Sequence, residues 1–282
     1  VFRAGEVTGK FDLEKGLFWH YAIGGVCPLA QYPEPSFWRA PVDNDFGNHL
    51  PSLAGVWRTA HVNKTLKSIQ VGDKTVQGLL VRMEWVLTDI DVPYTVDYLI
   101  GNDGSVTITA SIDLQGKRLP ELPRFGMRME LKKDYDHLAW YGRGPWENYP
   151  DRHTASFLGH YEDTVDGQYF PYIRPQETGN KTDVRWLTLR DANGTGLEVT
   201  GLQPIAFSAL HFAPEDLDPG LTRKLQHQVN VVPRKNVFLH VDLKQRGLGG
   251  DNSWGMLPHD EYRLLDKTYT YCLLYTSDAA DE

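Results

Sequence analysis

The side chains best suited to chemistry lie in two irregular segments, residues 36–48 and 140–152. Both segments combine glycine and proline with arginine and carboxylates, and a guanidinium can bind a carboxylate through two parallel hydrogen bonds. Such groups form either a polar site at the rim of a domain or ion pairs that hold long loops in place. We favour the structural role for the charged and amide residues of these segments: Arg39, Asp43, Asn44, Asp45, Arg143, Glu147, Asn148, Asp151 and Arg152.

Catalysis by these carboxylates is the alternative interpretation. Hydrolysis of a glycoside needs two carboxylates, about 5 Å or about 6.5–9.5 Å apart across the sugar. Asp43 with Asp45, or Glu147 with Asp151, could supply such a pair. Acidic residues beside proline, glycine and asparagine more often form turns, so we predict no catalytic residue in this chain. The sequence also has no Gly-Lys-Ser/Thr, His-Glu-x-x-His or Gly-x-Ser-x-Gly motif, and we predict no metal site.

A third segment, residues 249–255, places Trp254 among glycine, aspartate, asparagine and serine. These turn formers leave their backbone open to water, so a large indole among them is not expected in the core. A flat apolar ring with one N–H donor suits the apolar face of a sugar. The alternative is a tryptophan that folds back over its own sheet.

Short strands separated by turns must position these segments. Alternation of apolar and polar residues is clear in residues 237–243, and Asn102-Asp103-Gly104 is a strong hairpin turn. Helix signals are confined to residues 51–57 and 214–217. Further strands are expected at residues 11–13, 17–23, 76–88, 94–100, 105–114, 125–131, 137–141, 184–190, 196–201, 205–210 and 269–274. So many strands with so little helix predict an all-β fold, a large antiparallel two-sheet sandwich.

The domain is expected to span residues 1–275, with a disordered tail or a non-native addition at residues 276–282. The chain has 282 residues and a formal charge of −8, which argues against a nucleic-acid partner. No apolar run approaches the roughly 18 residues that would span a bilayer. Because the chain starts without methionine or a signal peptide, we expect an excised piece of a longer protein, so its start does not reveal the compartment. A bacterial protein, cytoplasmic or periplasmic, is expected. Cys27 and Cys272 would pair only if the terminal strands are neighbours, and we expect two separate thiols.

Three longer motifs occur in order along the chain: FWRAPVDND at residues 37–45, YGRGPWENYPDR at residues 141–152 and GGDNSW at residues 249–254. Together they resemble the C-terminal domain, or small chain, of the β-galactosidases of glycoside hydrolase family two. The resemblance covers nearly the whole chain, to about Tyr275. Three long motifs in register are far more specific than any short pattern.

This resemblance implies a galactose-mutarotase-like β-supersandwich, the last of five domains in a long polypeptide. In that family the catalytic glutamates belong to a central (β/α)₈ barrel, and the last domain lends one tryptophan to the sugar platform at the mouth of the barrel. The matching residue here is Trp254, in a substrate-binding loop with Asp251 and Asn252. The full-length enzymes use Mg²⁺ and Na⁺, with ligands mainly in other domains. The implied partners are the remaining domains, a β-galactoside such as lactose, and further copies in a homo-oligomer.

One position departs from the family pattern, because Trp146 stands where a glutamine is frequent. We predict that its ring packs against the protein, the alternative being an added sugar contact. Two other functions stay open. An aldose 1-epimerase shares the fold and needs a histidine and a carboxylate beside the anomeric carbon, and the one Asn-His pair here is Asn48-His49. A stand-alone carbohydrate-binding module would use Trp254 and Trp146.

Overall fold

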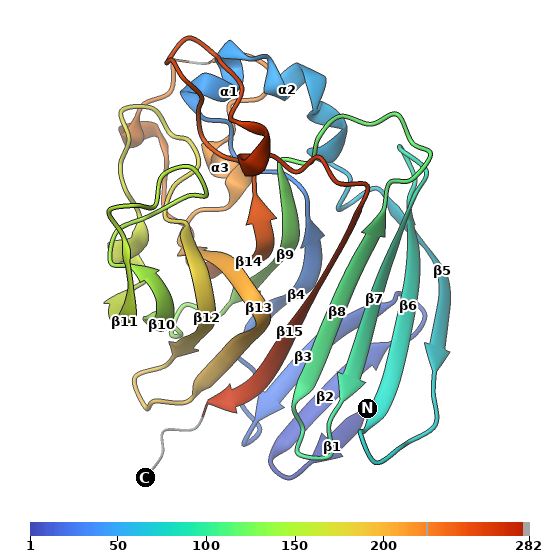
Figure 1. Cartoon of the computed structure of the whole chain (residues 1–282). Coiled ribbons are helices and arrows are strands. Elements are labelled where there is room, and N and C mark those ends of the chain that lie inside the picture. Colours follow the sequence, from blue (N-terminus) through green and yellow to red (C-terminus); the bar gives the residue numbers. More distant parts are fainter. Residues whose placement is uncertain (224, 279–282) are drawn as a thin grey trace.

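The computed structural model describes residues 1–223 and 225–278, and nearly all of its regular structure is antiparallel β-sheet (Figure 1). A small sheet contains β1 (Phe2–Ala4), β2 (Val7–Asp12) and β3 (Leu17–Ile23). The strands of the larger, twelve-stranded sheet are β4 (Leu29–Ser36), β5 (Lys64–Val71), β6 (Leu79–Leu87), β7 (Val92–Ile100), β8 (Val106–Asp113), β9 (Arg124–Leu131), β10 (His137–Gly144), β11 (Phe157–Thr164), β12 (Lys181–Arg190), β13 (Gly196–Leu210), β14 (Val237–Gln245) and β15 (Thr268–Asp278).

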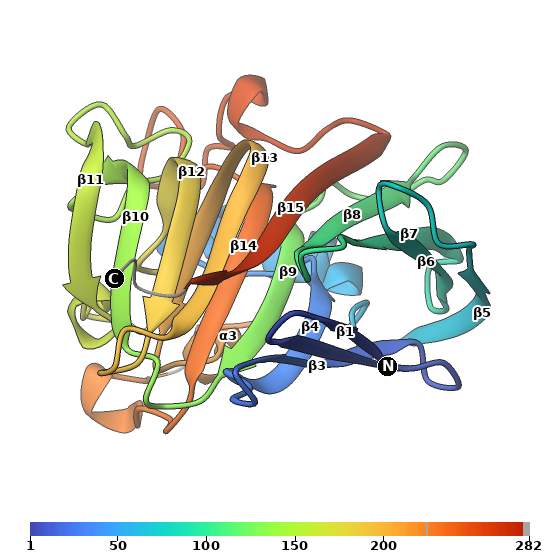
Figure 2. The same cartoon turned by 90° about the horizontal axis from the view of Figure 1, so that it is seen from below.

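The larger sheet divides into two branches at β13. Residues 196–201 of β13 pair with β15, and that branch continues through β8, β7 and β6 to β5. Residues 206–210 of β13 pair with β14, which leads to β9 and β4. Pro204 lies between the two halves, where its missing N–H cannot interrupt either ladder. Figures 1 and 2 show the two branches diverging from this strand.

The core fills the space between the two branches. In β7 the side chains of every second residue are buried, so one face of the strand is apolar throughout. Aromatic rings join the branches: Phe125 on β9 meets Tyr271 on β15 edge-on, with ring centroids 5.4 Å apart. Phe37, just after β4, meets Tyr94 on β7 in the same way at 5.7 Å. The predicted all-β, antiparallel supersandwich is confirmed.

Helices are short and lie in the connections. The two predicted helical segments are confirmed, and residues 43–47, expected to be irregular, form an additional helix. The short helices are α1 (Asp43–Gly47), α2 (Leu50–Leu53), η1 (Gly55–Trp57), η2 (Asp166–Gln168), α3 (Pro214–Leu217), η3 (Gln228–Asn230) and η4 (Asp260–Tyr262). Helices α1 and α2 lie at the same end of the molecule as the long connection after β14, at the top of Figure 1.

Residues 276–278 of the expected tail belong to a strand. Strand β15 continues to Asp278, and Thr276 pairs with Glu198 of β13. The backbone of this segment therefore extends the ladder that joins β15 to β13, which a small polar composition did not reveal. Residues 279–282 of the expected tail lie outside the described residues.

Candidate functional site

Trp254 lies on the long connection after β14, and 86% of its surface is exposed. The loop is shaped by its own polar side chains. Asn252 Oδ1 accepts hydrogen bonds from the backbone N–H groups of Trp254 (2.9 Å) and Met256 (3.4 Å). Asp251 lies 2.8 Å from His259 Nε2, and this hydrogen bond raises the pKa of the imidazole. Asp251 and Asn252 thus fix the turn from which the indole projects into solvent.

The tip of this loop rests on helix α1. A Cβ atom added to Gly47 would lie 2.7 Å from the Cα of Gly255 and 2.8 Å from the carbonyl oxygen of Trp254. Gly255 has a φ of +113°, a conformation that side chains disfavour. The close approach of the two backbones needs glycine on both sides, and it places the indole beside the end of α1.

The first motif clamps the base of the loop through a fully buried charge cluster, which we call the Asp45 cluster. Both oxygens of Asp45 accept hydrogen bonds from Arg39 Nη2, at 3.1 and 3.0 Å. Arg246 Nη1 donates to Asp45 Oδ1 at 2.6 Å, and Arg246 Nε lies 3.2 Å from Glu121. Arg39 also donates to the carbonyl oxygen of Gly247 at 2.9 Å. Arg39, Asp45 and Arg246 have no exposed surface, so the cluster ties α1 to the residues where the loop begins.

The second motif holds the next residues of the same loop. Asp151 Oδ2 accepts hydrogen bonds from the backbone N–H groups of Leu248 (2.7 Å) and Gly249 (3.0 Å). Asn44 of the first motif lies against the same glycine, since a Cβ atom added to Gly249 would be 2.4 Å from Asn44 Nδ2. Two motifs separated by about a hundred residues therefore meet at residues 246–249. No short-range pattern in the sequence could have revealed this meeting.

Glu147 is fully engaged by Arg152 of its own motif and by three donors from residues 172–179. Its oxygens accept hydrogen bonds from Arg152 (2.5 Å), Thr178 Oγ1 (3.0 Å), the Gly179 N–H (2.7 Å) and the Tyr172 hydroxyl. A carboxylate with four donors is held in one orientation and has no lone pair left for a substrate proton. Glu147 thus has the structural role that its loop requires.

Asn148 and Arg143 also have fixed partners. Asn148 is fully buried; its Oδ1 accepts from the Thr182 N–H at 2.8 Å and its Nδ2 donates to the Trp146 carbonyl oxygen at 3.0 Å. Arg143 Nε donates to Asp183 at 2.5 Å. These bonds satisfy polar groups that the long β10–β11 connection would otherwise leave unpaired.

Neither pair of carboxylates considered for glycoside cleavage has the surroundings of an acid–base pair. Asp45 is buried between two arginines, and Asp151 is used by backbone donors of the loop. Asp43 is exposed and lies 3.5 Å from Arg223. His49 is exposed and has a φ of +62° at the start of α2.

Some of the predicted residues line one open hollow of about 380 Å³ beside the loop. The hollow is bordered by Asn44, Asp151, Arg152, Leu248, Gly249, Gly250, Asp251, His259 and Tyr262. The structure thus brings together residues from all three motifs. The lining does not include the supporting residues Arg39, Asp45, Glu147 and Asn148.

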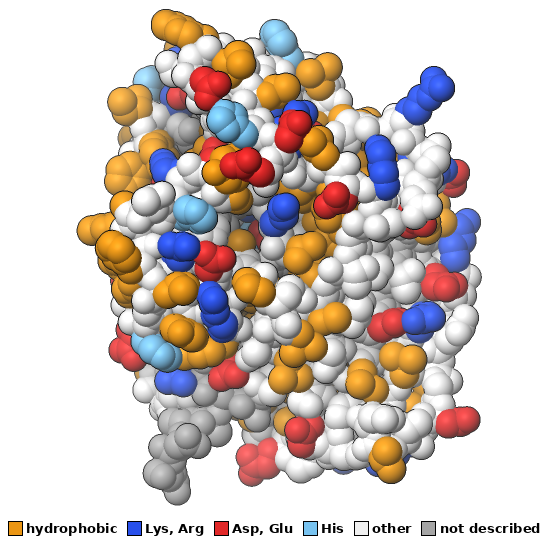
Figure 3. All heavy atoms as spheres, in the orientation of Figure 1, with side chains coloured by type: hydrophobic (Ala, Val, Ile, Leu, Met, Phe, Trp, Pro, Cys, Tyr) orange, Lys and Arg blue, Asp and Glu red, His pale blue; other side chains and the backbone are white. Residues whose placement is uncertain are grey.

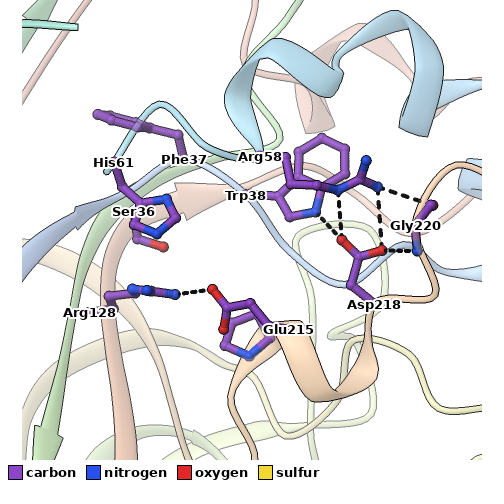
Figure 4. A pocket seen from close by; sticks show the side chains of 10 residues that line it. Ser36, Phe37, Trp38, Arg58, His61, Arg128, Glu215, Asp218 and Gly220 are labelled. Atoms are coloured by element: carbon purple, nitrogen blue, oxygen red, sulfur yellow. Dashed lines mark hydrogen bonds and ion pairs between the residues drawn. The ribbon is translucent and has the colours of Figure 1, made fainter. Parts of the chain in front are cut away.

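A second hollow, of about 200 Å³, was not foreseen from the sequence (Figure 4). Arg58 stacks on the ring of Trp38, 4.6 Å from its centroid, and pairs with Asp218 at 2.9 Å. Arg128 pairs with Glu215 on another side of the hollow. The remaining lining residues are Ser36, Phe37, His61, Pro214 and Gly220. They come from segments far apart in the chain, and the sequence carries no signal for their meeting.

His61 in this second hollow predicts a pH dependence of stability. Burial, reinforced by Arg128, lowers the pKa of His61 to about 4 from its ordinary 6.5. Between these pH values the unfolded chain binds the proton and the folded chain does not, so acid favours unfolding. The contribution of neutral His61 to the free energy of unfolding is fully present above pH 6.5. It decreases as the pH falls towards 4, by up to roughly 3 kcal/mol. Thermal midpoints measured from pH 4 to 7.5 should fall more steeply for the parent protein than for His61→Gln.

The control for this experiment is His227→Gln, which removes an exposed histidine. Its pH profile should follow that of the parent protein. Buried His240, whose pKa is also lowered by burial, leaves some acid sensitivity in His61→Gln. Identical profiles for the parent and His61→Gln would contradict the prediction.

Three further features of the chain concern possible metal ligands, its two cysteines and its helices. Over residues 1–223 and 225–278, no group of three or more histidine, cysteine, aspartate or glutamate side chains could hold a metal ion. Cys27 and Cys272 are free thiols. No helix within the described parts of the chain is long and apolar enough to cross a membrane.

The fold and the loop together define a large β-supersandwich domain with an aromatic side chain presented on a clamped loop. A solved structure of similar fold is the α-N-acetylgalactosaminidase NagBb from Bifidobacterium bifidum in its Gal-NHAc-DNJ complex, with a TM-score of 0.50 and 12% identity. The alignment covers 99% of this chain and 36% of that one. At this identity the likeness concerns the fold alone.

The chain belongs to the β-galactosidase small-chain family, whose model matches residues 3–274. It is 36% identical over 264 residues to a β-galactosidase of Priestia megaterium, covering 93% of this chain and 25% of the relative. It is 33% identical over 255 residues to a β-galactosidase of Streptococcus thermophilus, covering 89% of this chain and 24% of the relative. The chain therefore spans about a quarter of the length of these relatives. The family predicted from the three motifs is confirmed.

Proposed function

We propose that this chain is the C-terminal domain of a β-galactosidase that hydrolyses terminal β-galactosides such as lactose, and that it completes the substrate site with Trp254. The proposal is carried by one observation: an indole that is 86% exposed projects from a loop whose base is clamped by a fully buried charge cluster. An aromatic ring that is exposed on a rigid support is free to stack on a ligand and loses little entropy in doing so. The apolar face of a galactose ring is such a ligand.

The reacting groups are expected outside this chain. Glycoside cleavage needs two carboxylates on opposite sides of the bond, and the carboxylates of the three motifs are used to hold loops. In this proposal the catalytic barrel of the same polypeptide supplies the acid/base and the nucleophile, and Trp254 orients the sugar against them. The Mg²⁺ and Na⁺ that the family resemblance implies for the full-length enzyme would have their ligands mainly in other domains. Further copies of the polypeptide would form a homo-oligomer.

The direct test compares the full-length polypeptide with the isolated chain. Hydrolysis of nitrophenyl β-galactoside and lactose is expected from the full-length protein and not from purified residues 1–282. The physical reason is that the isolated chain can bind part of the sugar but has no acid–base pair beside the anomeric carbon. Hydrolysis by the isolated chain, or none by the full-length protein, would contradict the proposal.

A further inference from the structure

A hollow of about 550 Å³ lies between the β10–β11 connection and residues 163–181. We call it the Trp146 cavity. Its walls and floor include Trp146, Glu147, Arg152, Asp163, Tyr172 and Lys181. Its size is within the usual range for small-molecule sites, about 300–1,000 Å³. Arg152 also borders the hollow beside the Trp254 loop, so the two sites are neighbours that share one side chain.

The walls of the Trp146 cavity are exposed aromatic rings. The predicted packing role of Trp146 is wrong, because 73% of its surface is exposed. Its backbone is held at the base by Asn148, which leaves the indole at the rim rather than against the core. Phe170, 54% exposed, also borders the cavity, and its ring lies 4.7 Å from that of Tyr172. Figure 3 shows hydrophobic side chains gathered along the left edge of the molecule, over β10 and β11.

The floor of the cavity is polar and held in place by hydrogen bonds. Lys181 is 2% exposed; its Nζ donates to Gln168 Oε1 at 2.7 Å and to the Gly179 carbonyl oxygen at 3.3 Å. An ammonium group has three N–H donors, and these two bonds use two of them. Gln168 Nε2 in turn donates to Asp163 Oδ2 at 2.6 Å. The donors and acceptors are therefore oriented before a ligand arrives, which reduces the entropy lost on binding.

A second polar group closes the other side. Glu147 holds Arg152 at 2.5 Å and also accepts from the Tyr172 hydroxyl. Glu147 itself is saturated, but the guanidinium of Arg152 is half exposed and has further N–H groups that can donate. The Trp146 cavity is therefore lined by the cationic donors Arg152 and Lys181, by the Asp163 carboxylate and by aromatic rings.

We propose that the Trp146 cavity binds a pyranose sugar and is a second carbohydrate site beside the Trp254 loop. A pyranose presents C–H groups on one face and hydroxyls around its edge. The C–H face suits an exposed indole, and the hydroxyls suit the fixed donors and acceptors of Arg152, Asp163 and Lys181. A flat protein partner would need a continuous apolar surface, whereas here the aromatic rings border a hollow with charged groups at its floor.

The experiment uses the full-length polypeptide with its catalytic site saturated by a galactose-configured iminosugar, so that only additional sites titrate. Galactose, lactose and glucose are then titrated by calorimetry. The parent protein should show saturable binding of at least one of these sugars, and Trp146→Ala should weaken it roughly tenfold or more. Trp146→Phe keeps a ring and should retain most of the affinity. Phe157→Ala is the matched control, because Phe157 is also 73% exposed and lies outside the cavity lining.

Absence of saturable binding to the parent protein would overturn the proposal, as would equal binding by Trp146→Ala. Sedimentation of Trp146→Ala gives a further outcome. If subunit association changes while sugar binding does not, Trp146 contacts another subunit and not a sugar, and the proposal is overturned. Hydrolysis by the full-length protein is measured in parallel. If the parent protein hydrolyses the substrate normally but shows no saturable binding at a second site, only this inference is refuted. If the parent protein does not hydrolyse the substrate, the proposed function is refuted.

Discussion

Replacement of Trp254 by alanine in the full-length polypeptide is expected to lower kcat/KM for nitrophenyl β-galactoside by about 10- to 100-fold, mainly through a higher KM. The magnitude corresponds to about 1.4–2.8 kcal/mol, which is the scale of a lost stacking contact together with buried apolar area. Folding should be unaffected, because the indole is 86% exposed and makes no part of the core. Equal thermal midpoints for the parent and the variant would separate a binding effect from instability.

Two further variants make this test specific. Trp254→Phe retains an apolar ring and should recover part of the loss. Met256→Ala removes another exposed side chain of the same loop, one whose N–H is bound to the same Asn252 oxygen. It should leave kcat/KM nearly unchanged. Parent-like kinetics for Trp254→Ala would refute the role of this side chain in the substrate site.

The sequence predicts the general architecture because the core strands carry strong local patterns. Strand β7 alternates buried and exposed side chains along its whole length. Other strands lack such a pattern. Strand β4 contains Pro33 and Pro35, which argue against a strand, and one of the two shifts in its register with β9 falls across Pro33. Strand β11 lies at an edge with most of its side chains exposed, so no alternation of apolar and polar residues marks it as a strand.

The sequence also shows which segments matter, but not how they act. Arginine and aspartate within residues 39–45 indicate an ion pair, yet Arg246, the second partner of Asp45, lies 201 positions away. Nothing local distinguishes Asp43, which is exposed, from Asp45, which is fully buried. The orientation of Trp146 depends on the path of the β10–β11 connection, and that path is set by contacts with β12 such as Asn148 with Thr182. Long-range pairing of this kind leaves no short-range signal.

Replacement of Asp45 by asparagine is expected to destabilise the protein by about 3–5 kcal/mol, the largest effect predicted for a single side chain here. Asparagine keeps the shape but removes the charge, which leaves Arg39 buried without a carboxylate and leaves Arg246 with Glu121 alone. An uncompensated buried charge costs far more than the pair contributes when intact. The matched control is Asp43→Asn, two residues away. Its carboxylate is exposed and lies 3.5 Å from an exposed arginine, so its removal should cost less than about 1 kcal/mol.

Loss of the Asp45 cluster should also affect function before it unfolds the protein. Arg39 donates to the Gly247 carbonyl oxygen, and Arg246 is part of the same backbone segment, so a weakened cluster releases the base of the Trp254 loop. In Asp45→Asn, proteolytic cleavage within residues 248–257 should therefore become faster at temperatures well below the thermal midpoint, and KM should rise as in Trp254→Ala. Asp43→Asn should show neither change. If the two variants unfold at the same temperature and are cleaved equally slowly, the Asp45 cluster does not hold the loop. The support of Trp254 must then come from Asp151 and from the contact between Gly47 and Gly255.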